Sequence, residues 1–254
     1  MNTIIITTLS TTEANRLVAE EGPLLFLNGL VSLSVEVAEI LGGQRGFLWL
    51  DGLNELSAEV AEALAGHQGN LQLDGLNELS VEVAEALAGH SAWLWLDGLN
   101  ELSVEVAEAL AGHKGDLGLN GLKTILVVVA EHLAGHQGDL QLDGLNELSV
   151  EVAESLAECK GDLSLDGLRT LDAQRAEALS RHTGTLELNG VMDISSPVAR
   201  HLAGHMGGVL KLNGLRSISP AVKAILLEYK GSLTAKGVDI SACLLYTSPS
   251  PRDS

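Results

Sequence analysis

Aromatic residues are scarce in this chain: phenylalanine, tryptophan and tyrosine together make up 3% of its 254 residues. Basic residues are also few, with 15 Lys+Arg against 34 Asp+Glu and a formal net charge of −19. This balance argues against nucleic acid as a partner, because nucleic-acid-binding surfaces are basic, and it disfavours an anionic membrane. The longest unbroken apolar run covers only residues 125–130, so we expect no membrane-spanning segment.

Cysteine is nearly absent as well. Cys159 and Cys243 can form neither a disulfide framework nor a clustered metal site. Residues 1–20 lack the basic segment and the long apolar core of a signal peptide. Together these features fit a reducing compartment and favour a cytoplasmic location. No glycine-rich nucleotide-binding motif opens a helix, and we expect no cofactor.

The chain is filled by a repeat. An Asp-Gly or Asn-Gly dipeptide begins at positions 28, 51, 74, 97, 120, 143, 166, 189 and 213, with a spacing of 23 residues until the last, which is 24. Residues 71–93, LQLDGLNELSVEVAEALAGHSAW, show the unit best. We divide the chain into a partial or decayed first repeat (1–24), an array of about ten units (25–242) and a non-repeat tail (243–254).

Each unit predicts a strand, a turn and a short helix. Leu71-Gln72-Leu73 alternates as a half-buried strand does, Asp74-Gly75 is a turn signal, and Ser80 is a suitable N-cap for the helix that follows. Ordering one such unit costs more than its own burial returns, so units must stack. Strands pack about 4.8 Å apart and helices about 8–10 Å apart, so the stack curves with the strands inside.

The pattern L-x-L-D-G-L-x-x-L-S-x-x-x-A-x-x-L-A resembles a leucine-rich repeat of the bacterial and cysteine-containing types, including short acidic versions common in planctomycetes. The resemblance implies a right-handed α/β solenoid (horseshoe), with parallel strands on the concave face and short helices on the convex face. It also implies partner binding on the concave face, and no catalytic residues. One departure is that Leu76, Leu99 and Leu145 replace the usual Asn or Cys, so we expect loops without a side-chain ladder.

The tail, CLLYTSPSPRDS, breaks this pattern. Residues 243–253 resemble the translation of a transposase sequencing adapter, and we interpret them as an artefact that truncates the array. The alternative is a natural disordered tail rich in serine and proline.

Histidine occupies one column of the repeat. The column contains His67, His90, His113, His136, His182 and His205, with Gln44, Cys159 and Tyr229 as substitutes. One hypothesis is a metal site, to which the i,i+4 pairs His132/His136 and His201/His205 would add. We favour the other, in which each ring caps the C-terminus of its own helix. The serines at the N-caps lie beside glutamate rather than histidine, so we expect no nucleophilic catalysis and no enzyme.

The aromatic residues are unevenly placed. All five Phe and Trp residues lie in two columns that strand alternation turns outward: Phe26, Phe47, Trp49, Trp93 and Trp95. Asn70 and Gln72 lie between them, and Asp116, Asp139 and Asp162 continue the surface as an acidic stripe. We predict that this face binds a protein or peptide, which the aspartates would require to be basic. The alternatives are a carbohydrate-binding module using the spaced tryptophans, a purely structural array, and rings that only cover the end of the solenoid or contact a missing domain.

The fifth unit departs from the consensus. In the segment GLKTILVVVAEHL, Leu126 replaces the N-cap serine and Val128 replaces the first glutamate. Two hypotheses remain for residues 126–128: a local shift hides them, or they form a second contact surface such as a dimer seam.

Overall fold

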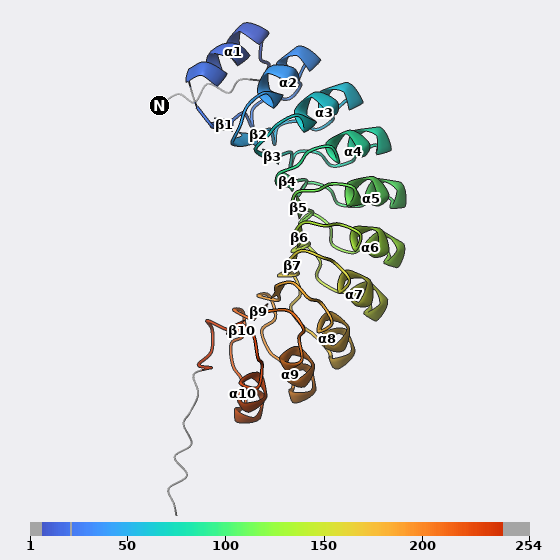
Figure 1. Ribbon diagram of the computed structural model, residues 1–254, viewed down its shortest axis with the longest axis vertical. Coiled ribbons are helices and arrows are strands. Elements are labelled where there is room, and N and C mark those ends of the chain that lie inside the picture. Colours follow the sequence, from blue (N-terminus) through green and yellow to red (C-terminus); the bar gives the residue numbers. More distant parts are fainter. Residues whose placement is uncertain (1–6, 21, 241–254) are drawn as a thin grey trace, which may run out of the picture.

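The computed structural model describes residues 7–20 and 22–240. Ten strands form one sheet in the order of the chain, each pairing in parallel with the next, and the helices alternate with them along the outside of the arc (Figure 1). The strands are β1 Leu24–Phe26, β2 Phe47–Trp49, β3 Asn70–Gln72, β4 Leu94–Trp95, β5 Leu117–Gly118, β6 Leu140–Gln141, β7 Leu163–Ser164, β8 Leu186–Glu187, β9 Val209–Lys211 and β10 Ser232–Thr234. The helices are α1 Thr11–Glu20, α2 Val35–Gly42, α3 Ala58–Ala65, α4 Val81–Leu87, α5 Val104–Ala111, α6 Val127–Leu133, α7 Val150–Leu156, α8 Ala173–Leu179, α9 Ser196–Ala203 and α10 Pro220–Leu226. The expected α/β solenoid with parallel inner strands is confirmed.

The five serines predicted as N-caps begin α2, α3, α4, α5 and α7. The hydroxyl of Ser80 accepts a hydrogen bond from the amide of Val83, and Ser34, Ser57, Ser103 and Ser149 do the same in their own units. Each cap satisfies an amide that the first turn of a helix leaves without a partner.

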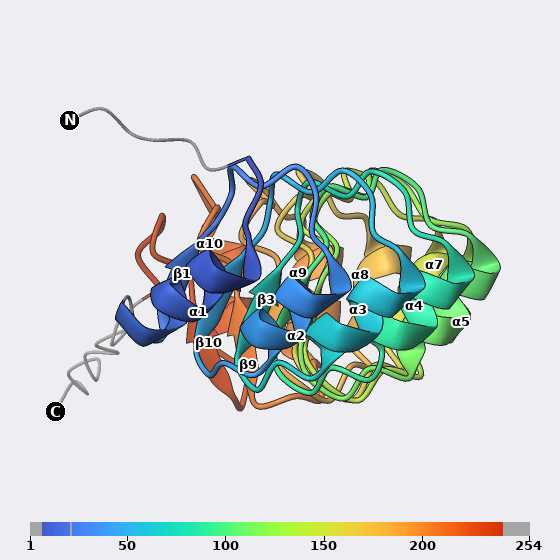
Figure 2. The ribbon, with the colours of Figure 1, turned by 90° about the horizontal axis from the view of Figure 1, so that it is seen from above.

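The core is a stack of identical layers. In most layers two strand-side leucines, a leucine after the turn, and Val, Ala and Leu from the helix are buried, as Leu71, Leu73 and Leu87 illustrate at 0% exposure. The strands pair in register, so that Leu48 lies beside Leu71 and Leu71 beside Leu94. Figure 2, from above, shows the helices α1 to α5 side by side in one outer layer. Every unit therefore buries its core against two neighbours.

The glycine of the turn is required by this close stacking. A Cβ on Gly75 would lie 2.1 Å from the carbonyl oxygen of Asp51 in the preceding unit. Gly75 does not have a positive φ, because within residues 7–20 and 22–240 only Gly22 and Gly46 do. The same holds at a helix end, where Gly66, the C-cap of α3, has φ −69°.

The first helix and the tail complete the description. Helix α1 packs beside α2 at the edge of the array, within the segment predicted to be a decayed repeat. Residues 243–254 lie outside the described residues, and the division of the chain into three parts stays a prediction. In the described part of the chain, every helix is too short or too polar to cross a bilayer.

Candidate interaction surface

The five Phe and Trp side chains form one continuous stack on the concave face. The ring centroids of Phe26 and Trp49 are 4.1 Å apart, and those of Trp49 and Phe47 are 5.0 Å apart. Phe47 then meets Trp95 at 6.5 Å, and Trp95 meets Trp93 at 4.9 Å. The planes of neighbouring rings differ by at most 23°. The columns that looked separate in sequence are therefore one aromatic stack, made of Phe26, Trp49, Phe47, Trp95 and Trp93.

The stack is only partly open to solvent. Phe26 is 66% exposed and Phe47 38%, whereas the three tryptophans are half-buried because they lie on one another. Phe47 and Trp95 belong to β2 and β4, so their rings meet across β3, which carries Asn70 and Gln72. The space that the sequence suggested between Trp49 and Trp95 is therefore largely filled by Phe47.

Asn70 and Gln72 differ in what they can offer. The amide nitrogen of Gln72 donates to Asp74 at 2.6 Å and to Asp51 at 3.2 Å. The side chain of Asn70 has no hydrogen bond within the described part of the chain. Only Asn70 can therefore meet a ligand without giving up an existing bond.

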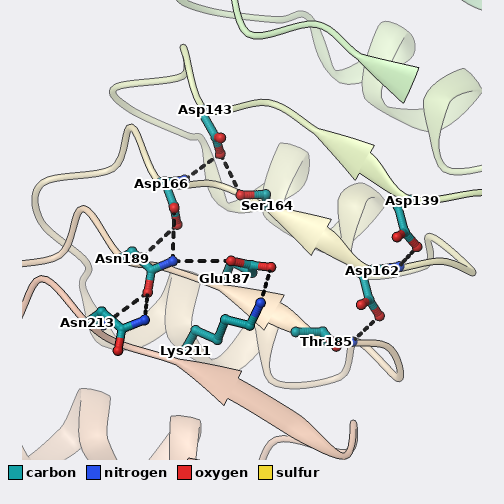
Figure 3. A network of polar contacts seen from close by, with 10 residues as sticks. All are labelled: Asp139, Asp143, Asp162, Ser164, Asp166, Thr185, Glu187, Asn189, Lys211 and Asn213. Atoms are coloured by element: carbon teal, nitrogen blue, oxygen red, sulfur yellow. Dashed lines mark hydrogen bonds and ion pairs between the residues drawn. The ribbon is translucent and has the colours of Figure 1, made fainter. Parts of the chain in front are cut away.

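The aspartates of the acidic stripe also form hydrogen bonds between neighbouring units. Oδ1 of Asp116 accepts the amide of Asp139 at 2.8 Å, Oδ1 of Asp139 accepts that of Asp162 at 2.8 Å, and Oδ1 of Asp162 accepts that of Thr185 at 2.7 Å. Each carboxylate thereby joins its unit to the next, while its Oδ2 has no hydrogen bond among the described residues. The predicted stripe is thus a ladder with one row of oxygens directed away from it (Figure 3).

A second ladder runs along the other end of the strands. Oδ1 of Asp74 accepts the amide of Asp97 at 2.9 Å, and Oδ1 of Asp97 accepts that of Asn120 at 2.9 Å. The same bond recurs from Asp51 to Asn213, the last one reaching Lys236. This ladder does not come from the leucine column, where the usual Asn or Cys is missing; it comes from the Asp/Asn column two positions earlier. A signal was present: this column contains only Asp or Asn, the two residues with a short side-chain acceptor of this geometry.

Between the ladders, β7 to β9 carry a polar network (Figure 3). Ser164 donates to Oδ1 of Asp143 at 2.6 Å, and the ammonium of Lys211 contacts Oε1 of Glu187 at 2.6 Å. Burial raises the pKa of Asp139, and repulsion from Asp116, Asp162 and Glu187 raises it further, although the amide of Asp162 counteracts this. The pKa of Lys211 is raised, first by its hydrogen bond to Glu187. The surface is therefore one that stabilises a cation and is strained by its own like charges.

The histidine column is a second stack, inside the protein. His67, His90, His113 and His136 lie parallel with centroids 5.8–6.2 Å apart, and His182 and His205 continue beyond Cys159. Four of the rings bond backbone carbonyls of the loops through Nε2; that of His67 lies 3.1 Å from O of Gly46, and that of His113 lies 3.0 Å from O of Ala92. Neither ring nitrogen of His136 or His182 has a hydrogen bond among the described residues. The hypothesis that each ring caps its own helix is wrong, since those helix ends are closed by backbone amides such as His67 N to Leu64 O.

This arrangement keeps the rings neutral. A carbonyl only accepts, so Nε2 carries the proton in the four rings that bond one, and Nδ1 of each of the six rings is buried without a partner in the described structure. Burial, and then repulsion from His113, lowers the pKa of His90 and of His136 to about 4. The lone pairs lie in the ring planes, whereas neighbouring rings meet face to face. No group of three or more potential ligands within residues 7–20 and 22–240 is placed to hold a metal ion.

Cys159 completes the column as a buried thiol. It is 2% exposed, and burial raises its pKa to about 12. A thiol in this state is a poor nucleophile, so Cys159 contributes to packing.

Comparisons with known proteins bear on the fold. No protein-family model matches the chain, and no curated protein matches it in sequence. Among solved structures, a leucine-rich-repeat protein of Leptospira interrogans is 17% identical, with a TM-score of 0.37 over 91% of this chain and 69% of that one. An internalin of Listeria monocytogenes is 13% identical, with a TM-score of 0.28 over 88% of each chain. By its repeating strand–helix unit and its single parallel sheet, the chain is a leucine-rich-repeat-like solenoid.

Proposed function

We propose that the chain is a non-catalytic module that binds an extended polypeptide along its concave face. The observation that carries the proposal is the aromatic stack, which gathers every Phe and Trp of the chain on one face. Tryptophan is the residue type most often found at binding hot spots, because a large ring loses much water on association. Phe26, at 66% exposure, and the edges of Trp49 and Trp95 would form the contact.

The acidic stripe gives the partner its charge. The free Oδ2 atoms of Asp116, Asp139 and Asp162 lie next to the aromatic stack in the order of the units and favour lysine or arginine. The contact between Lys211 and Glu187 is an internal example of an ammonium on this surface. A basic residue can also lie over an indole, which adds a cation–π contribution.

The stacking favours a polypeptide over a carbohydrate. A sugar binds to the open face of an aromatic ring, but the inner rings of this stack, Trp49, Phe47 and Trp95, have a neighbour on each face. Side chains and peptide groups can instead use ring edges, the indole N–H and Asn70. A purely structural array would not need exposed Phe26 at all.

The test is a displayed library of random peptides, selected on the wild-type protein. Enriched peptides are then measured against the double variant Trp49→Ala/Trp95→Ala, with Met206→Ala as a matched control. Met206 is 70% exposed and lies outside the concave strands, so Met206→Ala removes exposed apolar surface away from the proposed site. We expect the double variant to stay folded and to weaken binding at least about a hundredfold, since two hot-spot rings are lost.

Two results would oppose the proposal: no peptide is enriched, or the folded double variant binds as well as the wild type. Saccharide-dependent quenching of tryptophan fluorescence, with no peptide binding, would favour the carbohydrate-binding alternative. The basic character of the partner is tested separately with Asp139→Asn/Asp162→Asn, which keeps the ladder oxygens and removes two charges. We expect this double variant to bind the selected peptides more weakly and with a smaller dependence of the affinity on salt concentration.

A further inference from the structure

The outer layer of helices has one irregular position, at α6. Leu126 is 66% exposed, Val127 37% and Val128 38%, so the hypothesis that a local shift hides these residues is wrong. Leu126 is the N-cap of α6 and makes no side-chain hydrogen bond to the first turn. Within one copy of the protein, these substitutions lose a cap and place three apolar side chains in water.

The same position interrupts a line of negative charge. The first turns of the helices carry Glu36, Glu59, Glu82, Glu105 and Glu151, whereas α6 has Val128 there. Thr124 stands where other units carry Glu78 or Glu101, and Lys123 stands where they carry Asn. Lys123 is exposed and forms no salt bridge with the residues that the structure describes. Relative to its neighbours, this segment has lost two negative charges and gained one positive charge.

A groove lies directly beside the exposed side chains. It has a volume of about 440 Å³ and is lined by Ile125, Leu126, Leu148, Val152 and Arg175, among others. The corresponding groove between two earlier units, of about 430 Å³, is lined by Asn54, Glu55, Asn77 and Glu78 together with leucines. Thr124, Glu147 and Ser149 also line the groove at α6, and Leu126 and Val127 form part of its wall. The exposed apolar side chains therefore lie at the edge of a groove of mixed polar and apolar lining.

We propose that this α6 patch, defined as Leu126, Val127 and Val128 with the groove beside them, is the surface through which two copies of the chain associate. A knob next to a groove on one surface is what a two-fold contact needs, because each copy supplies both halves. Charge selects the occupant. A chain of net charge −19 repels its own copies, and the α6 patch is a break in the acidic line, because Thr124 and Val128 stand where the neighbouring units carry glutamate.

The rim of the patch is complementary to itself. Lys123 lies at the start of the irregular segment, and Glu105 and Glu151 lie on the helices at either side of α6. In a two-fold contact, Lys123 of one copy faces these glutamates on the other. The apolar centre consists of three side chains per copy, so we expect a weak dimer that forms with rising concentration and not a permanent one.

The test is sedimentation velocity of the full chain over a range of concentrations, in reductant because Cys243 could otherwise link two copies. The variant is Leu126→Ser/Val128→Glu, which restores the sequence of the neighbouring units and the N-cap, so it is not expected to unfold. Met206→Glu is the matched control, because it adds the same charge at an exposed apolar residue on another unit. Lys123→Glu tests the rim.

We expect the wild type and Met206→Glu to dimerise alike, the double variant to stay monomeric, and Lys123→Glu to raise the dissociation constant about tenfold. A wild type that is monomeric at every concentration would overturn the proposal, and so would a dimer that survives in the double variant. A monomeric wild type that binds lipid vesicles through these residues would assign the patch to a membrane and likewise overturn it.

Discussion

The indole of Trp95, on β4, lies across Gly118, its pairing partner on β5. A Cβ on Gly118 would come 2.6 Å from Cδ1 and 3.3 Å from Nε1 of Trp95. The missing side chain of β5 therefore provides the space that the last part of the aromatic stack occupies. The position of Trp95 is set by a glycine in the unit after it as well as by the rings before it.

Gly118→Ala should displace Trp95 and leave the fold intact. The methyl group overlaps the ring, and because the ring cannot move toward Phe47 without changing the stack, we expect a cost of about 1 kcal/mol in the free energy of unfolding. Tryptophan emission should shift to longer wavelength as the indole becomes more hydrated. Gly208→Ala is the control, because a Cβ there meets nothing within 4 Å, and it should change neither quantity. Unchanged emission from Gly118→Ala would mean that Trp95 does not rest on this glycine.

The 23-residue period of the sequence predicted the structural features that recur within each unit, namely the strand, the turn and the capped helix. Alternation at Leu71 and Leu73 and the N-cap at Ser80 are local patterns whose physical meaning does not depend on the neighbouring unit. The order of parallel strands then follows from stacking. Contacts between units were harder. The hydrogen bond from the amide of Asp97 to Asp74 depends on how closely the turns of two neighbouring units approach. The turn propensity of Asp-Gly already explained the presence of these aspartates, so no ladder was needed to account for them.

The histidine stack should make stability depend on pH. The pKa of His90 and of His136 is about 4 in the folded chain, lowered first by burial, against about 6.5 when unfolded. Between these values the unfolded chain binds more protons, so stability is fully present above pH 6.5 and is lost as the pH falls toward 4. The raised pKa values of Asp74, Asp139 and Asp166 act in the opposite direction, since burial first, and then repulsion by neighbouring carboxylates, favours their protonated forms in the folded chain.

His90→Gln isolates the contribution of one ring. Gln44 already stands in this column, so the substitution is one that the repeat accommodates. We expect the slope of unfolding free energy against pH, from urea unfolding at a series of pH values, to fall by up to about 1.4 kcal/mol per pH unit. Equal slopes for His90→Gln and the wild type would indicate that the buried ring takes up its proton without unfolding.

The histidines also show why the site was only partly predictable. The period places the rings of His67 and His90 one above the other, as observed. It does not say where the in-plane nitrogens point, because that depends on the path of the loop that returns to the next strand. The aromatic face was similar: alternation put Trp49 and Trp95 on the outer side, but only the structure brought Phe47 between them.

The two duties of Asp139, hydrogen bonding and charge, can be separated by a pair of variants. Asp139→Ala leaves the amide of Asp162 without its acceptor, and we expect a loss of about 1–2 kcal/mol. Asp139→Asn keeps an oxygen that accepts from that amide, and it removes a carboxyl group whose pKa is raised by burial and by neighbouring carboxylates. It should therefore be as stable as the wild type at acidic pH and more stable at neutral pH. The measurement is urea unfolding at both pH values, and a loss with Asn equal to that with Ala would contradict the ladder.

Leu126→Ser should stabilise the single copy. Leu126 has φ −75° and ψ 153°, close to the −72° and 162° of Ser103, so a serine can accept the amide of Val129 without any change of backbone. We expect a gain of about 1 kcal/mol, the usual contribution of an N-cap, from urea unfolding at a concentration where the chain is monomeric. Ser103→Leu is the reciprocal control, and we expect it to lower the free energy of unfolding by a similar amount. If Leu126→Ser gives no gain while Ser103→Leu is destabilising, Leu126 makes a compensating contact within the copy, and its exposure costs the fold less than the lost cap implies.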